Sequence, residues 1–229
     1  ILLKNGIVRR FGGYGLEIGS SDLAFRNVVF DAVTFDSVAY DAAFSNSKII
    51  DQTNSTSDRA FTFINCSFDG RGVVAQVGLP TASVVKNCVF RKFNRIIVSS
   101  PGKHRFFDCD IDSYLDLIYD SNGGSYFDNC NINCSYLVRG ENVDGSLYAW
   151  RNCVITSSLS TPPYTFFGGS PNTRFIYTGN VLNGTNAQAV AAGETIFSDH
   201  VIVTGTGSAT VTVPTVLAHP LNRIAIDNT

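Results

Sequence analysis

A short pattern of apolar and polar positions recurs along almost the whole chain. Each copy reads apolar, any residue, Asn or Asp, a small residue or Cys, any residue, apolar, as in Phe63 to Phe68. Apolar and polar residues alternate within a copy, which is the period of a β-strand and not of a helix. The third positions of the ten copies are Asn5, Asn27, Asn46, Asn65, Asn87, Asp108, Asn129, Asn152, Gly179 and Asp199. They follow one another at steps of 19 to 27 residues, so the chain is a tandem repeat.

The Asn or Asp of each copy predicts one identical turn per repeat. These two residue types tolerate left-handed backbone better than other residues apart from glycine. A unit of this length cannot bury its own apolar face, so the units must stack on one another. Stacking places each turn above the last, where Asn side chains can hydrogen-bond in a ladder. The pattern therefore predicts an all-β parallel β-helix of about ten coils, each coil adding about 4.8 Å to its length.

Three inward columns are predicted from the position of each residue relative to the turn. The first column follows the turn directly and consists of Cys66, Cys88, Cys109, Cys130 and Cys153. The second lies two residues further on and consists of Phe30, Ile49, Phe68, Phe90, Ile111, Ile132 and Ile155. The third lies about nine residues after the turn and consists of Val74, Ile96, Leu117 and Val138. Trp150 also takes an inward position, so we expect it in the core.

The cysteines are interpreted as buried thiols and not as a metal or redox site. Five of the six fall in one inward column, and no Cys-x-x-Cys pair occurs. We therefore expect no metal and no cofactor. Reduced thiols favour assembly in a reducing compartment.

Composition narrows the class of protein. The chain has 229 residues, of which 44% are hydrophobic and 16% charged, so it is not a disordered protein. A net charge of −2 argues against nucleic acid as a partner, and no apolar run is long enough to insert into a membrane. Methionine is absent and the chain begins Ile1-Leu2-Leu3, which we interpret as a piece whose upstream part is missing.

The repeated apolar-x-Asn-Cys-x-apolar units resemble the right-handed β-helices of the pectate-lyase-like superfamily. Within that superfamily the chain is most similar to phage tailspike and tail-fibre proteins, over residues 1–203. The resemblance implies a homotrimer in the phage tail of the virion, attached through an upstream domain and assembled in the host cytoplasm. It also implies recognition of bacterial surface polysaccharide. No catalytic motif of the family can be matched residue by residue.

The last part of the chain departs from the repeat. Residues 204–229 are expected to form either a cap over the end of the stack or a trimerisation segment. The open end of a β-helix has unpaired strand edges, which such a segment would cover.

Pairs of carboxylates on outward positions are the candidate catalytic residues. Asp120 and Glu141 are expected one coil apart, at about 5 Å, which is the spacing of retaining glycosidases. Asp110 and Asp112 are outward neighbours on one strand at about 7 Å, which suits inversion. The alternative is that these carboxylates belong to an ordinary solvated surface.

Four further residues are candidates for substrate binding. Arg95, Asp116 and Arg139 are expected on the same wall of the β-helix as the first carboxylate pair. Tyr164 belongs to an extra loop in the longest repeat, and an exposed aromatic side chain could stack on a sugar ring. The alternative is that this loop packs against another subunit.

The run Lys103-His104-Arg105 is a basic cluster that could supply the base of a polysaccharide lyase. The alternative is solvated charge in a loop. No Ser-His-Asp arrangement can be argued from the sequence.

Three functions are compatible with the sequence. The first is a trimeric virion spike or fibre that binds, and could cleave, a surface glycan. The second is a secreted monomeric polysaccharide lyase or glycoside hydrolase, and the third is a structural shaft or adhesin segment without a site. A trimer predicts an outward apolar stripe, for which the candidates are Val73, Val89, Ile97, Ile118 and Val154.

Overall fold

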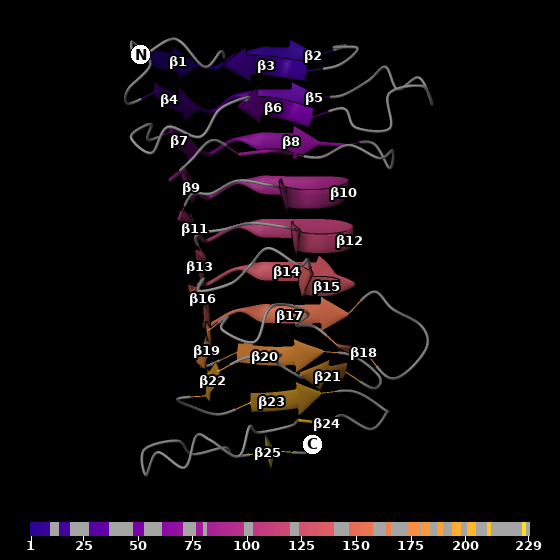
Figure 1. The fold of residues 1–229 in the computed structure, drawn as a ribbon. Helices are drawn as coiled ribbons and strands as arrows, with labels where there is room; N and C mark the ends of the chain where they lie inside the picture. The colour runs from indigo at the N-terminus through magenta and orange to yellow at the C-terminus, as the bar shows by residue number, and fades with distance from the viewer. Residues whose placement is uncertain are drawn as a thin grey trace.

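All regular elements of the described residues are β-strands, as predicted (Figure 1). The computed structural model describes residues 1–9, 14–18, 28–36, 48–52, 61–70, 77–79, 82–98, 103–119, 124–139, 147–157, 164–165, 174–178, 180–183, 187–189, 194–197, 201–204, 210–211 and 226–227.

Two long parallel sheets run side by side along the molecule. Sheet A is nine-stranded and consists, in spatial order, of β1 (Leu2–Lys4), β4 (Val28–Asp31), β7 (Phe61–Ile64), β9 (Val84–Lys86), β11 (His104–Phe107), β13 (Ser125–Asp128), β16 (Leu147–Arg151), β19 (Arg174–Thr178) and β22 (Glu194–Phe197). Sheet B consists of β2 (Ile7–Arg9), β5 (Thr34–Asp36), β8 (Ser67–Asp69), β10 (Val89–Val98), β12 (Asp110–Tyr119), β14 (Asn131–Cys134), β17 (Val154–Ser157), β20 (Asn180–Asn183), β23 (Val201–Thr204) and β25 (Ile226–Asp227), with β15 (Tyr136–Arg139) paired to β12.

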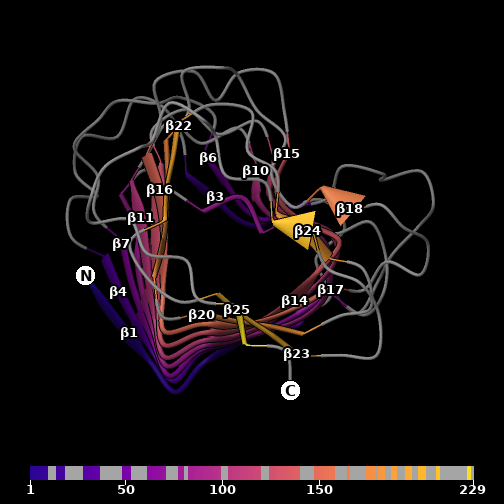
Figure 2. The same ribbon diagram turned by 90° about the horizontal axis from the view of Figure 1, so that it is seen from below.

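Chain order and spatial order agree throughout these sheets. Each sheet A strand is followed by a sheet B strand, and the next sheet A strand pairs in parallel with the one before. We call one such circuit a coil. The two sheets form two sides that meet at a corner when the molecule is viewed along its axis (Figure 2). This all-β parallel arrangement is compatible with the predicted β-helix.

Two smaller parallel sheets lie beside these. One pairs β3 (Tyr14–Ile18) with β6 (Lys48–Gln52), and the other consists of β18 (Tyr164–Thr165), β21 (Ala187–Ala189) and β24 (Thr210–Val211). Within residues 204–229, β24 pairs with β21 and β25 pairs with β23. The predicted domain boundary at residue 203 and the role of that segment stay predictions.

The corner between sheets A and B is a single residue in left-handed conformation. Its φ lies between 50° and 54° at Asn5, Ala32, Asn65, Asn87, Asp108, Asn129 and Asn152. The corner N–H donates to a carbonyl of the next coil, as from Asn87 to Phe107 O at 3.0 Å. The residue two positions on donates back to the previous coil, as from Val89 to Cys66 O at 3.0 Å. The N–H of the residue between them donates to a side chain of the next coil instead, as from Cys66 to Cys88 Sγ at 3.3 Å, so it still has a partner.

The predicted side-chain ladder is present at two pairs of neighbouring corners. Asn87 Nδ2 donates to Asn65 Oδ1, and Asn129 Nδ2 donates to Asp108 Oδ1, each at 2.7 Å. The aligned corner amides therefore connect neighbouring coils through their side chains as well as through the backbone.

The second and third predicted copies of the repeat were placed wrongly. The corner of the second coil is Ala32, whereas Asn27 and Asn46 lie outside the described residues. Phe30 consequently belongs to sheet A, before the corner, and Ile49 belongs to β6. Because the corner residue is alanine, the Asn or Asp that marks the other corners is missing here. The repeat pattern was therefore matched to other asparagines. The prediction of ten coils stays a prediction.

The cysteine column is confirmed as a stack of buried thiols, and none of the six cysteines forms a disulfide. Each thiol of the column donates to the carbonyl two residues earlier, at 3.2 Å for Cys88, Cys109 and Cys153. The thiol therefore forms a hydrogen bond across its own turn, on the inner side of the corner. Asn180 takes the same place after Cys153 and accepts a hydrogen bond from the Cys153 N–H at 2.8 Å.

Aromatic rings stack through the core from coil to coil. The Phe35, Phe68 and Phe90 rings lie 4.8 and 4.5 Å apart and within 3° of parallel. In sheet A, Phe127 stacks on Trp150 at 5.9 Å, and Trp150 is fully buried as predicted. The spacing of the Phe35, Phe68 and Phe90 rings follows the strand spacing, so stacking adds to burial in the coils that carry these rings.

The third inward column is right for two coils and wrong for the next. Ile96 and Leu117 are buried, but Leu137 and not Val138 follows them. Asp112 of β12 is opposite Asn133 of β14, and Asp116 is opposite Tyr136 of β15. Between these two pairs, β12 therefore has one residue more than the next coil. A one-residue slip exchanges the two faces of a strand.

The predicted outward apolar stripe also needs correction. Ile118 is fully buried and cannot belong to it. Val154 is exposed and Val89 half-buried, whereas the side chain of Ile97 and all of Val73 lie outside the described residues.

Candidate functional site

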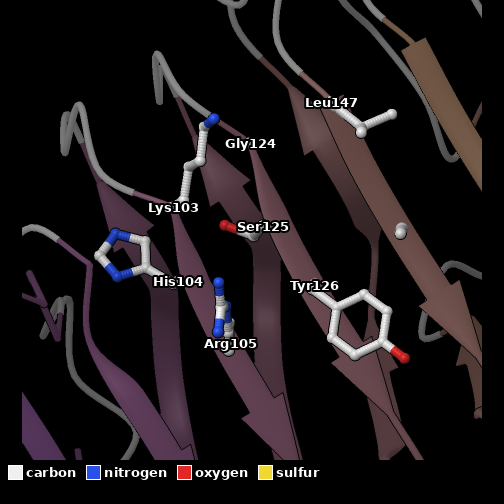
Figure 3. Close-up of a pocket in the computed structure, with 8 residues that line it drawn as sticks. Lys103, His104, Arg105, Gly124, Ser125, Tyr126 and Leu147 are labelled. Atoms are coloured by element: carbon white, nitrogen blue, oxygen red, sulfur yellow. The ribbon is translucent and has the colours of Figure 1, made fainter.

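The outer face of sheet A carries a depression of about 180 Å³ across β11, β13 and β16 (Figure 3). Its lining consists of Lys103, His104, Arg105, Gly124, Ser125, Tyr126, Leu147 and Ala149. The parallel register places Arg105, Tyr126 and Ala149 in one row across the strands. Gly124 and Ala149 have little or no side chain, so the face is hollow between their larger neighbours.

Gly124 is required where β13 begins. Its φ is +86°, and a Cβ added to it would collide with the carbonyl oxygen of Leu147 in the next coil. Glycine alone allows both this conformation and this close approach. The hollow is therefore tied to the way β13 and β16 pack.

Tyr126 forms a fixed aromatic wall of the depression. Its hydroxyl donates to Asp128 Oδ2 at 2.9 Å, and its ring lies 5.9 Å from that of Phe107. Partial burial and the hydrogen bond to Asp128 raise the pKa of Tyr126, so the phenol is neutral at pH 7. Tyr126 can therefore offer an apolar surface and not a base.

Exposed cations lie around this wall, together with the carboxylate of Asp128. Lys103 and Arg105 are exposed at the rim, and Lys86 lies 6.0 Å from the centre of the Phe107 ring. Arg151 is also exposed on β16. The two aromatic rings thus lie among four cationic side chains.

His104 and Ser125 lie on the strands beneath the depression, with their side chains on the inner face of sheet A. The register pairs them, and both are buried. Burial lowers the pKa of His104 to about 4, so its imidazole is neutral at pH 7. The predicted basic loop cluster is therefore corrected: His104 lies on a strand and faces inward, while Lys103 and Arg105 face solvent.

The candidate catalytic pair Asp110 and Asp112 lies on β12 of sheet B, away from the depression. Asp110 Oδ1 accepts a hydrogen bond from Asn131 Nδ2 and Asp112 Oδ1 accepts one from Asn133 Nδ2, both at 2.9 Å. These bonds connect β12 to β14, which is a structural role. Asp120 and Glu141 lie outside the described residues, so catalysis by either pair stays a prediction.

The candidate substrate-binding residues are only partly brought together. Arg95 is half-buried, and Asp116 lies opposite it, as predicted. Arg139 lies opposite Tyr119. Tyr164 of β18 lies opposite Ala187 of β21. The structure does not describe the side chains of Asp116, Arg139 and Tyr164.

Tyr126, Gly124 and Ala149 were not among the residues predicted from the sequence. The only signal for the hollow was a glycine and an alanine at outward positions of neighbouring coils. That signal has meaning only after the register between β13 and β16 is known.

Within the described ranges, no three His, Cys, Asp or Glu side chains are grouped to hold a metal ion. Likewise, the described residues include no helix of the length and apolarity needed to cross a membrane. Comparison with protein-family models, with curated proteins and with solved structures found no match to this chain.

Proposed function

We propose that this chain is a segment of a phage tailspike or tail fibre that recognises bacterial surface polysaccharide. The observation that supports the proposal is the fixed Tyr126 ring beside exposed cations in a depression of the outer sheet. An aromatic face packs against the apolar face of a sugar ring, and cations bind its oxygens. A ring already held in place loses little conformational entropy on binding.

The proposal includes a right-handed, pectate-lyase-like β-helix of about ten coils that assembles as a homotrimer on the virion. The parallel sheets and the buried, unbridged cysteines support it, because such a stack can assemble in a reducing cytoplasm. An upstream domain would attach it to the phage tail.

The test is binding of the purified chain to immobilised capsular and lipopolysaccharide glycans. We expect wild-type binding to at least one glycan, and at least tenfold weaker binding for Tyr126→Leu, which keeps an apolar side chain but loses the flat ring. Tyr114→Leu on β12 is the matched control, because Tyr114 is exposed on the other sheet, and it should bind like wild type.

Failure to bind any glycan, or equal binding by the Tyr126→Leu variant, would contradict the proposal. New reducing ends in the bound glycan would add an enzymatic activity, to be assigned with Asp110→Asn and Asp112→Asn. Light scattering tests the assembly, since a trimer has three times the mass of a single chain. A monomer would contradict the homotrimer.

A further inference from the structure

We propose that the depression over β11, β13 and β16 binds the carboxylate group of an acidic sugar residue. This inference rests on the proposed function and adds the chemical class of the ligand. It assigns Lys103 and Arg105 as the anion-binding side chains and Tyr126 as the surface under the sugar ring.

The two cations are placed to act on one group. Lys103 and Arg105 are two residues apart along the same strand direction, so both face outward, at a Cα separation of about 7 Å. Within the described residues neither forms an ion pair. A guanidinium holds a carboxylate through two parallel hydrogen bonds, and an ammonium adds a point charge.

The side chains that line the depression come from the outer face of sheet A. Ser125 and His104 alternate along their strands with the more exposed Tyr126 and Arg105, so their side chains face the interior, where both are buried. A ligand in the depression therefore meets Lys103, Arg105 and Tyr126 and not these two buried groups.

The size of the depression limits what it can hold. About 180 Å³ is well below the volume of pockets that enclose whole drug-sized ligands. The hollow beside Gly124 and Ala149 therefore suits one substituent and one face of one sugar ring. We infer that a polymer lies across the strands and places a single acidic residue here.

The experiment compares each glycan that binds with the same glycan after chemical reduction of its carboxyl groups to alcohols. We expect binding to acidic glycans to fall at least tenfold after reduction. Lys103→Gln and Arg105→Gln should each weaken binding to the unreduced glycan by at least tenfold and reduce its dependence on salt concentration. Arg91→Gln removes an exposed cation from sheet B and should leave binding unchanged.

A further variant tests whether the depression is the binding site without changing its charge. Ala149→Leu fills the hollow without removing a cation and should abolish binding, while its unfolding midpoint stays near that of wild type. Full binding by folded Ala149→Leu would overturn the inference.

The outcomes separate the two proposals. Equal binding to native and carboxyl-reduced glycans, or binding only to neutral or sulfated glycans, overturns the carboxylate site and leaves glycan recognition standing. Binding to no glycan overturns both.

Discussion

At the scale of single residues, the corner ladder depends on which side chains can donate. Asn87 donates to Asn65, and Asn129 donates to Asp108, but the row does not continue between Asn87 and Asp108. A carboxylate has no N–H to offer to the Asn87 Oδ1 above it. Asp108 therefore divides the ladder into two runs.

Asp108→Asn should join these runs. The new amide can donate to Asn87 and still accept from Asn129, so we expect the free energy of unfolding to rise by about 0.5–1.5 kcal/mol. Urea denaturation measures it. Asp110→Asn is the control, because the residue above it is Val89, which offers no side-chain acceptor. A lower midpoint for Asp108→Asn would contradict the ladder argument.

His104 makes stability depend on pH. Its pKa lies at about 4 in the folded chain because of burial, against 6.5 in the absence of structure. Between these values the unfolded chain binds the proton and the folded chain does not, so stability falls as pH drops from 6.5 towards 4. The loss assigned to His104 is about 3 kcal/mol. The free energy of unfolding of His104→Gln, measured between pH 4 and 6.5, should depend less steeply on pH than that of wild type. An unchanged dependence would show that other groups cause it.

At the scale of elements, β13 is placed by a single residue at its start. That residue is Gly124, whose φ is +86° and whose missing Cβ leaves room for the Leu147 carbonyl. The strand pairing and the hollow on the outer face thus depend on the same residue.

Gly124→Ala should therefore destabilise the fold by about 1–3 kcal/mol, through both the positive φ and the collision. Gly6→Ala is the matched control, because a Cβ there would have nothing within 4 Å, and it should change little. The difference between the two unfolding midpoints is the measurement. Similar midpoints would mean that β13 shifts at no cost.

The elements differ in how well the sequence predicts them, for physical reasons. The corners at Asn65 and Asn87 were predictable because left-handed backbone selects few residue types, and the small thiols beside them were predictable because the corner has little room. The second coil was not, since Ala32 adopts the same backbone without the usual residue. Nor was the slip at Leu137, because an extra residue inside β12 leaves no mark on the alternation. The depression could not be predicted either, because it is formed by residues of three coils whose register the sequence does not give.

At the scale of the whole molecule, each coil contacts mainly the coils above and below it, as Figure 1 shows for sheets A and B. Corner, thiol and ring repeat in register from coil to coil. Stability in such a stack is approximately a sum over units and their interfaces.

Removal of one whole coil should thus be tolerated. Deleting residues 109–129 joins Asp108 to Cys130, so corner and thiol stay adjacent and Phe106 faces Trp150 in place of Phe127. We expect a strand-rich circular dichroism spectrum and a cooperative unfolding transition at a lower midpoint. Deleting residues 109–119 removes part of a coil and should prevent folding. If the whole-coil deletion also fails, the coils are not interchangeable.

The thiols that close the corners have a consequence for how the protein is made. With none of the six cysteines bridged, no disulfide has to form during folding, and no oxidant or disulfide isomerase is needed. Sulfur atoms enclosed in this way are also shielded from peroxide and from foreign thiols. The same unbridged core is therefore compatible with reducing and with oxidising surroundings.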